Sequence, residues 1–150
     1  MKEVLISIKP KWCQLIASGE KTVEVRKTRP KQETPFKCYI YETKGLYEGT
    51  GGCLFNGRGK VIGEFVCDEI VAAECGCYCV LNPTETLLHA FDLLEYADGK
   101  TVYGWHISDL VIYDKPKELN EFWVEGYQTY DCPPLKRLKR PPQSWCYVEV

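Results

Sequence analysis

Alternating apolar and polar residues, or runs rich in branched and aromatic residues, predict six β-strands along the chain. The segment 21–27 is typical, because two valines alternate there with Glu24 and Arg26. A strand places such neighbours on opposite faces, so this one has an apolar face and a charged face. We expect the strand at 61–73 to bend near residues 67–69. The predicted strands cover residues 4–8, 21–27, 37–43, 61–73, 106–113 and 143–150.

A helical spacing of apolar residues predicts one helix between the first two strands. Trp12, Leu15 and Ile16 fall on one face of such a helix. Pro10 suits its first turn, and Gly19 suits its end. We therefore expect a helix of about three turns over residues 10–19.

A second helix is predicted to begin after Asn82, which is a favourable capping residue. A proline and then an acidic residue follow in the first turn, as is typical of helix starts. We expect a short helical turn at 116–119 as well. The apolar residues that continue the second helix are predicted to form a buried stripe: Leu87, Leu88, Phe91 and Leu94.

Residues 44–60 hold six glycines, which raises the question of a phosphate-binding loop. The segment lacks the glycine spacing of both common phosphate-loop motifs, and Val61 stands where a serine or threonine would be needed after Gly59-Lys60. We expect the tip of a hairpin here instead. Residues 126–143, with two Pro-Pro pairs, are predicted to be a loop.

The order of these elements predicts one domain spanning residues 1–150. Most elements are strands, helices occur singly between them, and neither an internal repeat nor a linker is visible. Strands in this arrangement must pair with partners distant in sequence. The predicted fold class is therefore α+β, with a small mixed β-barrel and flanking helices.

Composition excludes some classes of protein and hides a charge asymmetry. With 45% hydrophobic residues, 13% aromatic residues and a net charge of −2, the chain is neither disordered nor a sequence-blind coat for nucleic acid. Residues 21–31 nevertheless carry a net charge of +4, residues 136–140 carry another +4, and the remainder carries −10. Two basic segments on an acidic body would make a local anion site if the fold brought them together.

The nine cysteines do not indicate a disulfide scaffold. Neither a signal peptide nor an apolar run of membrane-spanning length is visible, so we expect a soluble cytoplasmic protein with reduced thiols. Cys75, Cys77 and Cys79 would share one face of a strand. They lack the usual Cys-x-x-Cys spacing and a nearby histidine, so we expect no metal and no cofactor.

Lys21, Glu24 and Arg26 are the most concentrated candidate site. Glu24 and Arg26 lie on one face of the predicted strand, about 7 Å apart at ~3.3 Å per residue. They would offer a polar ligand both an acceptor and a planar donor. Lys21 has the opposite parity and joins them only if the turn reorients it. The alternative is an exposed strand face with a weak surface ion pair.

Several motifs resemble the ASCH domain, a relative of the RNA-binding PUA domains. They are Ile6-Ser7-Ile8-Lys9-Pro10, the pattern Gly19-x-Lys21-x-x-Glu24-x-Arg26, residues 106–110 and residues 142–148. The likeness extends from about residue 4 to residue 150 and is to bacterial and prophage members. It implies a PUA-like barrel in which the charged motif lines a cleft.

The resemblance implies an RNA- or modified-nucleotide-binding module. One small bacterial branch, similar in the Gly-x-Lys-Thr motif, hydrolyses N4-acetylcytidine with a lysine, a threonine and a downstream glutamate. Lys21 matches that lysine, but Glu24 occupies the threonine position, and Glu64 and Glu69 are only candidates for the glutamate. An amidohydrolase or a ribonuclease with Lys21 and Glu24 as acid/base residues is therefore the alternative. A protein-interaction module with an idle cleft is a third possibility.

Aromatic and basic residues extend the expected ligand site. Single-stranded RNA stacks its bases on aromatic side chains, and Trp12 lies in the helix just ahead of the charged strand. Lys27, Arg137 and Lys139 are candidates to contact phosphates. The alternative for Arg137 and Lys139 is a solvated loop without a ligand. We expect a monomer that binds RNA or a nucleotide and no membrane.

Overall fold

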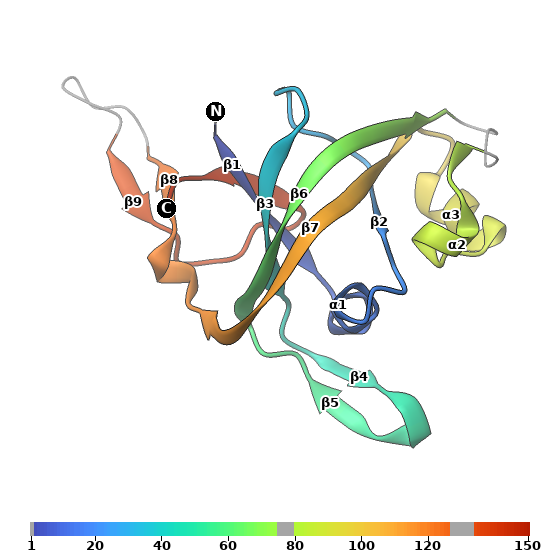
Figure 1. Cartoon of the computed structure of the whole chain (residues 1–150), viewed down its shortest axis with the longest axis horizontal. Coiled ribbons are helices and arrows are strands. Elements are labelled where there is room, and N and C mark those ends of the chain that lie inside the picture. The colour runs from blue at the N-terminus through green and yellow to red at the C-terminus, as the bar shows by residue number, and fades with distance from the viewer. Residues whose placement is uncertain (1, 75–79, 127–133) are drawn as a thin grey trace.

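A six-stranded sheet forms the body of the protein (Figure 1). The structure is a computed structural model and describes residues 2–74, 80–126 and 134–150. The sheet has the strand order β10-β1-β3-β6-β7-β2, in which β1 and β3 run parallel and the other neighbours run antiparallel. Its strands are β1 (Glu3–Ile8), β2 (Val23–Arg26), β3 (Phe36–Glu42), β6 (Lys60–Ala73), β7 (Val102–Lys117) and β10 (Trp145–Val148).

Two hairpins and a few short helices surround this sheet. The hairpins pair β4 with β5 and β8 with β9, and they project in different directions (Figure 1). None of the helices among the described residues has the length and apolar character needed to cross a bilayer. The remaining elements are β4 (Leu46–Glu48), β5 (Leu54–Asn56), β8 (Trp123–Glu125), β9 (Leu135–Arg137), α1 (Pro10–Ala17), α2 (Pro83–Thr86), α3 (Ala90–Ala97), η1 (Thr50–Gly52) and η3 (Leu119–Glu121).

The strand β1, next to the edge strand β10, is buried on both faces, which explains why its apolar residues run almost without a break. Val4 and Ile6 pack into one cluster with α1 residues such as Ile16. Leu5 points to the other face and packs against Phe122. Because β1 has core on both sides, it can hold the neighbouring strands at fixed positions around the site described below.

The fold class predicted from the sequence is α+β, and the structure agrees, since it is mostly sheet with few helices. All six predicted strands are present, with register shifts along β6, one of them between Cys67 and Ile70 where we expected a bend. In the part of the chain that the structure describes, β10 and β2 are the two edges of the ladder. The closed barrel therefore stays a prediction.

The glycine-rich segment forms the β4–β5 hairpin, as predicted. Gly51 and Gly52 at its tip have φ angles of 80° and 75°. Residues with side chains rarely adopt this left-handed region, so the turn favours glycine at both positions. The hairpin explains the glycines without a phosphate ligand.

The single helix predicted after Asn82 is wrong in its extent. Asn82 caps α2 as expected, since its Oδ1 accepts a hydrogen bond from the Thr84 N–H at 3.0 Å. Leu87 then adopts a left-handed φ of 57°, which ends α2, and α3 begins afresh at Ala90. The predicted stripe is not buried either, because Phe91 is 84% exposed and the buried residue of α3 is Leu93.

Two smaller predictions also need correction. The loop predicted at 126–143 contains the strand β9, which pairs with β8 in register Trp123 to Arg137. The helical turn expected at 116–119 occurs instead as η3, because β7 continues to Lys117. Cys75, Cys77 and Cys79 lie outside the described residues.

Candidate functional site

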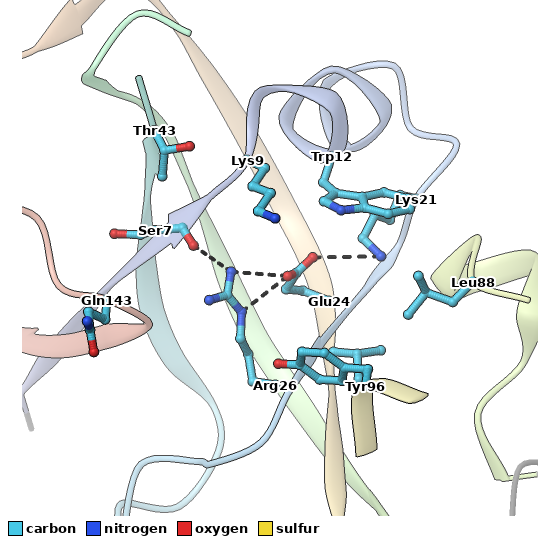
Figure 2. A pocket seen from close by; sticks show the side chains of 11 residues that line it. Ser7, Lys9, Trp12, Lys21, Glu24, Arg26, Thr43, Leu88, Tyr96 and Gln143 are labelled. Atoms are coloured by element: carbon cyan, nitrogen blue, oxygen red, sulfur yellow. Dashed lines mark hydrogen bonds and ion pairs between the residues drawn. The ribbon is translucent and has the colours of Figure 1, made fainter. Parts of the chain in front are cut away.

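A pocket of about 330 Å³ opens between α1, β2 and α3. Figure 2 shows its charged side chains converging from β2 and from the turn before it. We call it the site pocket. Its lining residues are Ser7, Lys9, Trp12, Lys21, Glu24, Val25, Arg26, Thr43, Leu88, Tyr96 and Gln143.

Strand β2 directs Glu24 and Arg26 into this pocket. It pairs with β7 in a register that sets Glu24 opposite Trp105, so that its side chain faces inward. Val25, between the two charged residues, belongs to a separate apolar cluster on the α2–α3 side. The Glu24 and Arg26 side chains are 8% and 11% exposed, so they do not lie on the open strand face that the sequence left as an alternative.

Arg26 is held by three separate segments of the chain. Its Nη2 donates to the Ser7 carbonyl at 2.5 Å, and its Nη1 donates to Ser144 Oγ at 3.3 Å. Its Nε donates to Glu24 Oε1 at 3.2 Å, and Nη2 lies 3.1 Å from the same oxygen. Most of the guanidinium donors are therefore used within the protein, and Arg26 fixes the position of the Glu24 carboxylate.

The second oxygen of Glu24 has no hydrogen-bond partner among the described residues. Glu24 Oε2 is fully buried. Lys21 Nζ is 3.7 Å away, which makes an ion pair but not a hydrogen bond. A buried carboxylate oxygen without a donor is costly, and the pocket is the place from which a ligand could supply one.

Lys21 reaches the pocket from the turn that precedes β2. Its backbone N–H donates to the Leu15 carbonyl, so the turn is tied to α1 and Lys21 lies outside the alternation of β2. Its Nζ donates to the Thr86 carbonyl at 2.5 Å and lies 4.7 Å from the centre of the Trp12 ring. Burial lowers the pKa of Lys21, and the negative charge of Glu24 partly opposes that effect.

Two aromatic residues form apolar walls beside the charged groups. Trp12, predicted from the sequence, and Tyr96 on α3 both line the pocket (Figure 2). Lys27 does not line it, but its Nζ lies 4.8 Å from the centre of the Tyr96 ring. The structure therefore brings Trp12, Lys21, Glu24 and Arg26 together and places Lys27 next to them.

Arg137 and Lys139 lie away from this pocket. Arg137 is on β9, where it donates to the Asn120 carbonyl at 3.0 Å and lies over the Trp123 ring. Figure 1 shows the β8–β9 hairpin on the opposite side of the sheet from α3. The two basic segments of the sequence thus do not meet in one cleft.

Sequence reasoning missed Tyr96 and Leu88 as pocket residues. Both belong to the region of α2 and α3, where one continuous helix was predicted. Thr22 N–H donates to the Glu85 carbonyl, and this contact holds the region against the start of β2. No local pattern in the sequence reports that contact. Ser7 and Lys9 also line the pocket. Both belong to the motif Ile6-Ser7-Ile8-Lys9-Pro10, so the family resemblance was the one feature of the sequence that pointed to them.

Among the described residues that line the pocket, Glu24 is the one carboxylate, so the groups for acid/base chemistry are few. Glu64 and Glu69, the candidates for a second catalytic glutamate, are not among its lining residues. Glu64 instead accepts a hydrogen bond from the Tyr113 hydroxyl and pairs with Lys37 at 3.2 Å. Among the described residues no group of three or more histidine, cysteine or acidic residues is arranged to hold a metal.

Comparisons with known proteins agree on one family. The sequence model described as "ASCH domain" matches residues 6–117. The solved structure of ASCH from Zymomonas mobilis is 22% identical, with a TM-score of 0.63 over 99% of this chain and 88% of that one. No curated protein matches the sequence.

Two mutants of the Zymomonas mobilis protein ZmASCH have also been solved. The tyrosine-to-phenylalanine mutant is 22% identical, with a TM-score of 0.67 over 99% of this chain and 91% of that chain. The serine-to-alanine mutant is 21% identical, with a TM-score of 0.67 over 99% and 89%. At this level of identity, the likeness shows a shared fold.

Proposed function

The chain belongs to the ASCH domain family, and from this premise we propose that the site pocket binds one nucleotide of an RNA chain, or a modified nucleotide. In this proposal the protein acts as a cytoplasmic monomer without a cofactor or a metal. The fold completes a PUA-like barrel around the site.

The observation that carries the proposal is Glu24 Oε2, which is buried and accepts no hydrogen bond among the described residues. Glu24 Oε2 is a buried acceptor, and Lys21 Nζ, a donor, lies 3.7 Å from it. Every nucleobase presents a donor and an acceptor side by side on its pairing edge. A base entering the pocket would donate to Glu24 and accept from Lys21, which satisfies the buried oxygen.

The walls and the size of the pocket suit a single planar base. Trp12 and Tyr96 offer aromatic surfaces, and bases of single-stranded RNA stack on such side chains. A volume of about 330 Å³ is at the lower end of the range for small-ligand pockets. It accommodates one nucleotide rather than several.

The phosphate of the bound nucleotide would contact the lysines at the rim of the site pocket. Arg26, which the sequence offered as a planar donor to a polar ligand, uses most of its donors in hydrogen bonds to Ser7, Ser144 and Glu24. Lys9 and Lys27 are exposed beside the pocket and remain available for a phosphate. Arg26 then acts by positioning the carboxylate.

Binding is favoured over hydrolysis because the described residues place no second carboxylate in the lining of the site pocket. An amidohydrolase of the N4-acetylcytidine type would need a downstream glutamate near Lys21. Glu64 is engaged with Tyr113 and Lys37, and Glu69 lines a different cavity. A ribonuclease would need an acid and a base that can exchange protons with the RNA. Here the two candidates, Glu24 and Lys21, form an ion pair with each other.

Isothermal titration with the four ribonucleoside monophosphates tests this proposal. Wild-type protein is expected to bind at least one of them with 1:1 stoichiometry. Trp12→Leu is expected to weaken that binding about tenfold, because stacking of one base contributes roughly 1–3 kcal/mol. Tyr47→Leu, on the β4–β5 hairpin outside the lining, is the matched control and should bind as wild type does. Failure of all four nucleotides, of a short RNA and of N4-acetylcytidine monophosphate to bind would refute the proposal.

A further inference from the structure

The first basic segment continues from the site pocket onto the side of β10. Beyond Arg26, the Thr28 hydroxyl oxygen accepts a hydrogen bond from Trp145 Nε1 at 2.9 Å. Three residues on, the Lys31 backbone N–H donates to the Tyr147 hydroxyl at 3.0 Å. The segment is therefore held along β10, with Lys27 and Lys31 exposed on its outer side.

At its far end β10 borders a second pocket of about 250 Å³. The Lys2 Nζ lies 5.8 Å from the centre of the Tyr147 ring, and both residues line this pocket. Gln32 Nε2 donates to the Lys2 carbonyl at 2.8 Å, which ties the end of the first basic segment to the same place. We call this the β10 pocket. The other residues of its lining are Trp123, Val124, Glu125, Cys146, Val148 and Glu149.

The second basic segment flanks the β10 pocket on its other side. Trp123 and Glu149 form an isolated β-bridge with two backbone hydrogen bonds of 2.8 Å, which fixes β8 beside the end of the chain. Arg137 lies over the Trp123 ring at 4.9 Å and is exposed. Lys139, also exposed, follows two residues later.

The site pocket and the β10 pocket are lined by different residues of the last segment of the chain. Gln143 lines the site pocket and Tyr147 lines the β10 pocket. At ~3.3 Å per residue, these positions are at most about 13 Å apart. Exposed basic side chains are found at the start, beside the middle and at the end of this path. We call them the basic track: Lys27, Lys31, Lys2, Arg137 and Lys139.

We propose that the basic track binds the backbone of a single-stranded RNA whose one nucleotide occupies the site pocket and whose flanking nucleotides reach the β10 pocket. This inference rests on the proposed function. The argument for RNA is charge complementarity, because a polyanion gains from a row of cations on an otherwise acidic body. Tyr147 and Trp123 supply ring surfaces for a base at the far end.

Acidic residues limit where the phosphates can lie. Glu125 and Glu149 line the β10 pocket, and Glu125 pairs with Lys2. Phosphates near these carboxylates would be repelled, so the backbone follows the outer cations while the uncharged base faces the pocket. The footprint is therefore short and ends at Arg137 and Lys139.

Binding of a fluorescein-labelled 12-nucleotide single-stranded RNA, measured by anisotropy at several salt concentrations, tests the track. The double variant Arg137→Gln/Lys139→Gln removes two cations far from the site pocket. Its affinity for the 12-mer is expected to fall about tenfold or more. Its log–log salt slope should fall by about 1.4, at ~0.7 per lost contact to a single strand. Mononucleotide binding should be unchanged.

The matched control is Lys100→Gln/Lys115→Gln, which removes two exposed lysines that are not part of the basic track. It should bind the 12-mer as wild type does. If the two double variants bind the 12-mer equally, or if the 12-mer binds no better than a mononucleotide, the track is refuted while the site pocket stands. If wild-type protein binds neither RNA nor mononucleotide, the proposed function is wrong and the track is refuted with it.

Discussion

Lys21 and Glu24 form a buried ion pair, with Nζ 3.7 Å from Oε2 and side chains only 2% and 8% exposed. At this distance the two charged groups do not hydrogen-bond to each other, and each has a further partner in the protein. Lys21 also donates to the Thr86 carbonyl, and Glu24 is held through its other oxygen by Arg26. The pair therefore couples the region of α2 to β2, and it leaves Glu24 Oε2 without a hydrogen-bond donor among the described residues.

Removing the buried ammonium should destabilise the protein. Lys21→Met leaves Glu24 with one cation fewer and the Thr86 carbonyl without its donor, so the free energy of unfolding is expected to fall by about 3 kcal/mol. Urea denaturation measures this change. Lys11→Met is the matched control, because Lys11 also lies over the Trp12 ring, at 4.8 Å, but is exposed. Its effect should stay within about 0.5 kcal/mol, and equal losses in the two variants would argue against the buried pair.

Arg26 should be needed for stability as a guanidinium and not merely as a cation. Arg26→Lys keeps the charge but loses the planar set of donors that reaches Ser7, Glu24 and Ser144 together. Its free energy of unfolding is expected to fall by about 2 kcal/mol, whereas Ser144→Ala, which removes one long hydrogen bond, should cost less than about 1 kcal/mol. A lysine variant as stable as wild type would contradict the positioning role of Arg26.

The sequence predicted the strand that carries the site better than it predicted the surroundings. The alternation around Glu24 and Arg26 correctly predicted that the two side chains share one face of β2, because side chains of a strand point to alternate faces. The same rule gives Lys21 the opposite parity, and the prediction was that it joins them only if the turn reorients it. It joins them because β2 begins only at Val23, so the rule does not apply to Lys21.

The walls of the pocket could not be predicted from the sequence, because they are positioned by contacts between residues that are distant along the chain. The apolar spacing from Leu87 to Leu94 looks helical, yet Leu87 is left-handed and splits the segment in two. The position of Tyr96 follows from this break and from the packing of Leu93 into a cluster with Val25. Such tertiary constraints override local propensity. Strand β9 escaped prediction for a similar reason, since three residues need a partner to be recognised as a strand.

Alkaline pH should destabilise the protein through Tyr113. Burial and the hydrogen bond to Glu64 raise the pKa of this phenol above its ordinary value of 10.0. The unfolded chain therefore loses the phenolic proton first, and the free energy of unfolding falls as the pH rises past about 10. In Tyr113→Phe the fall between pH 9 and 11 should be smaller. Denaturation curves across this range measure it, and parallel profiles for the two proteins would exclude the contribution of Tyr113.

The most direct test of the central claim is the affinity of Glu24→Gln for the nucleotide that wild-type protein binds best. Glutamine keeps the shape of the side chain and an oxygen for Arg26, but it replaces the Oε2 acceptor, which has no hydrogen-bond donor among the described residues, with an amide donor. Titration calorimetry, on protein shown by its unfolding curve to be folded, is expected to give an affinity at least about tenfold weaker. An affinity equal to that of wild type would show that Glu24 does not contact the ligand and would contradict the claim that this pocket recognises a base.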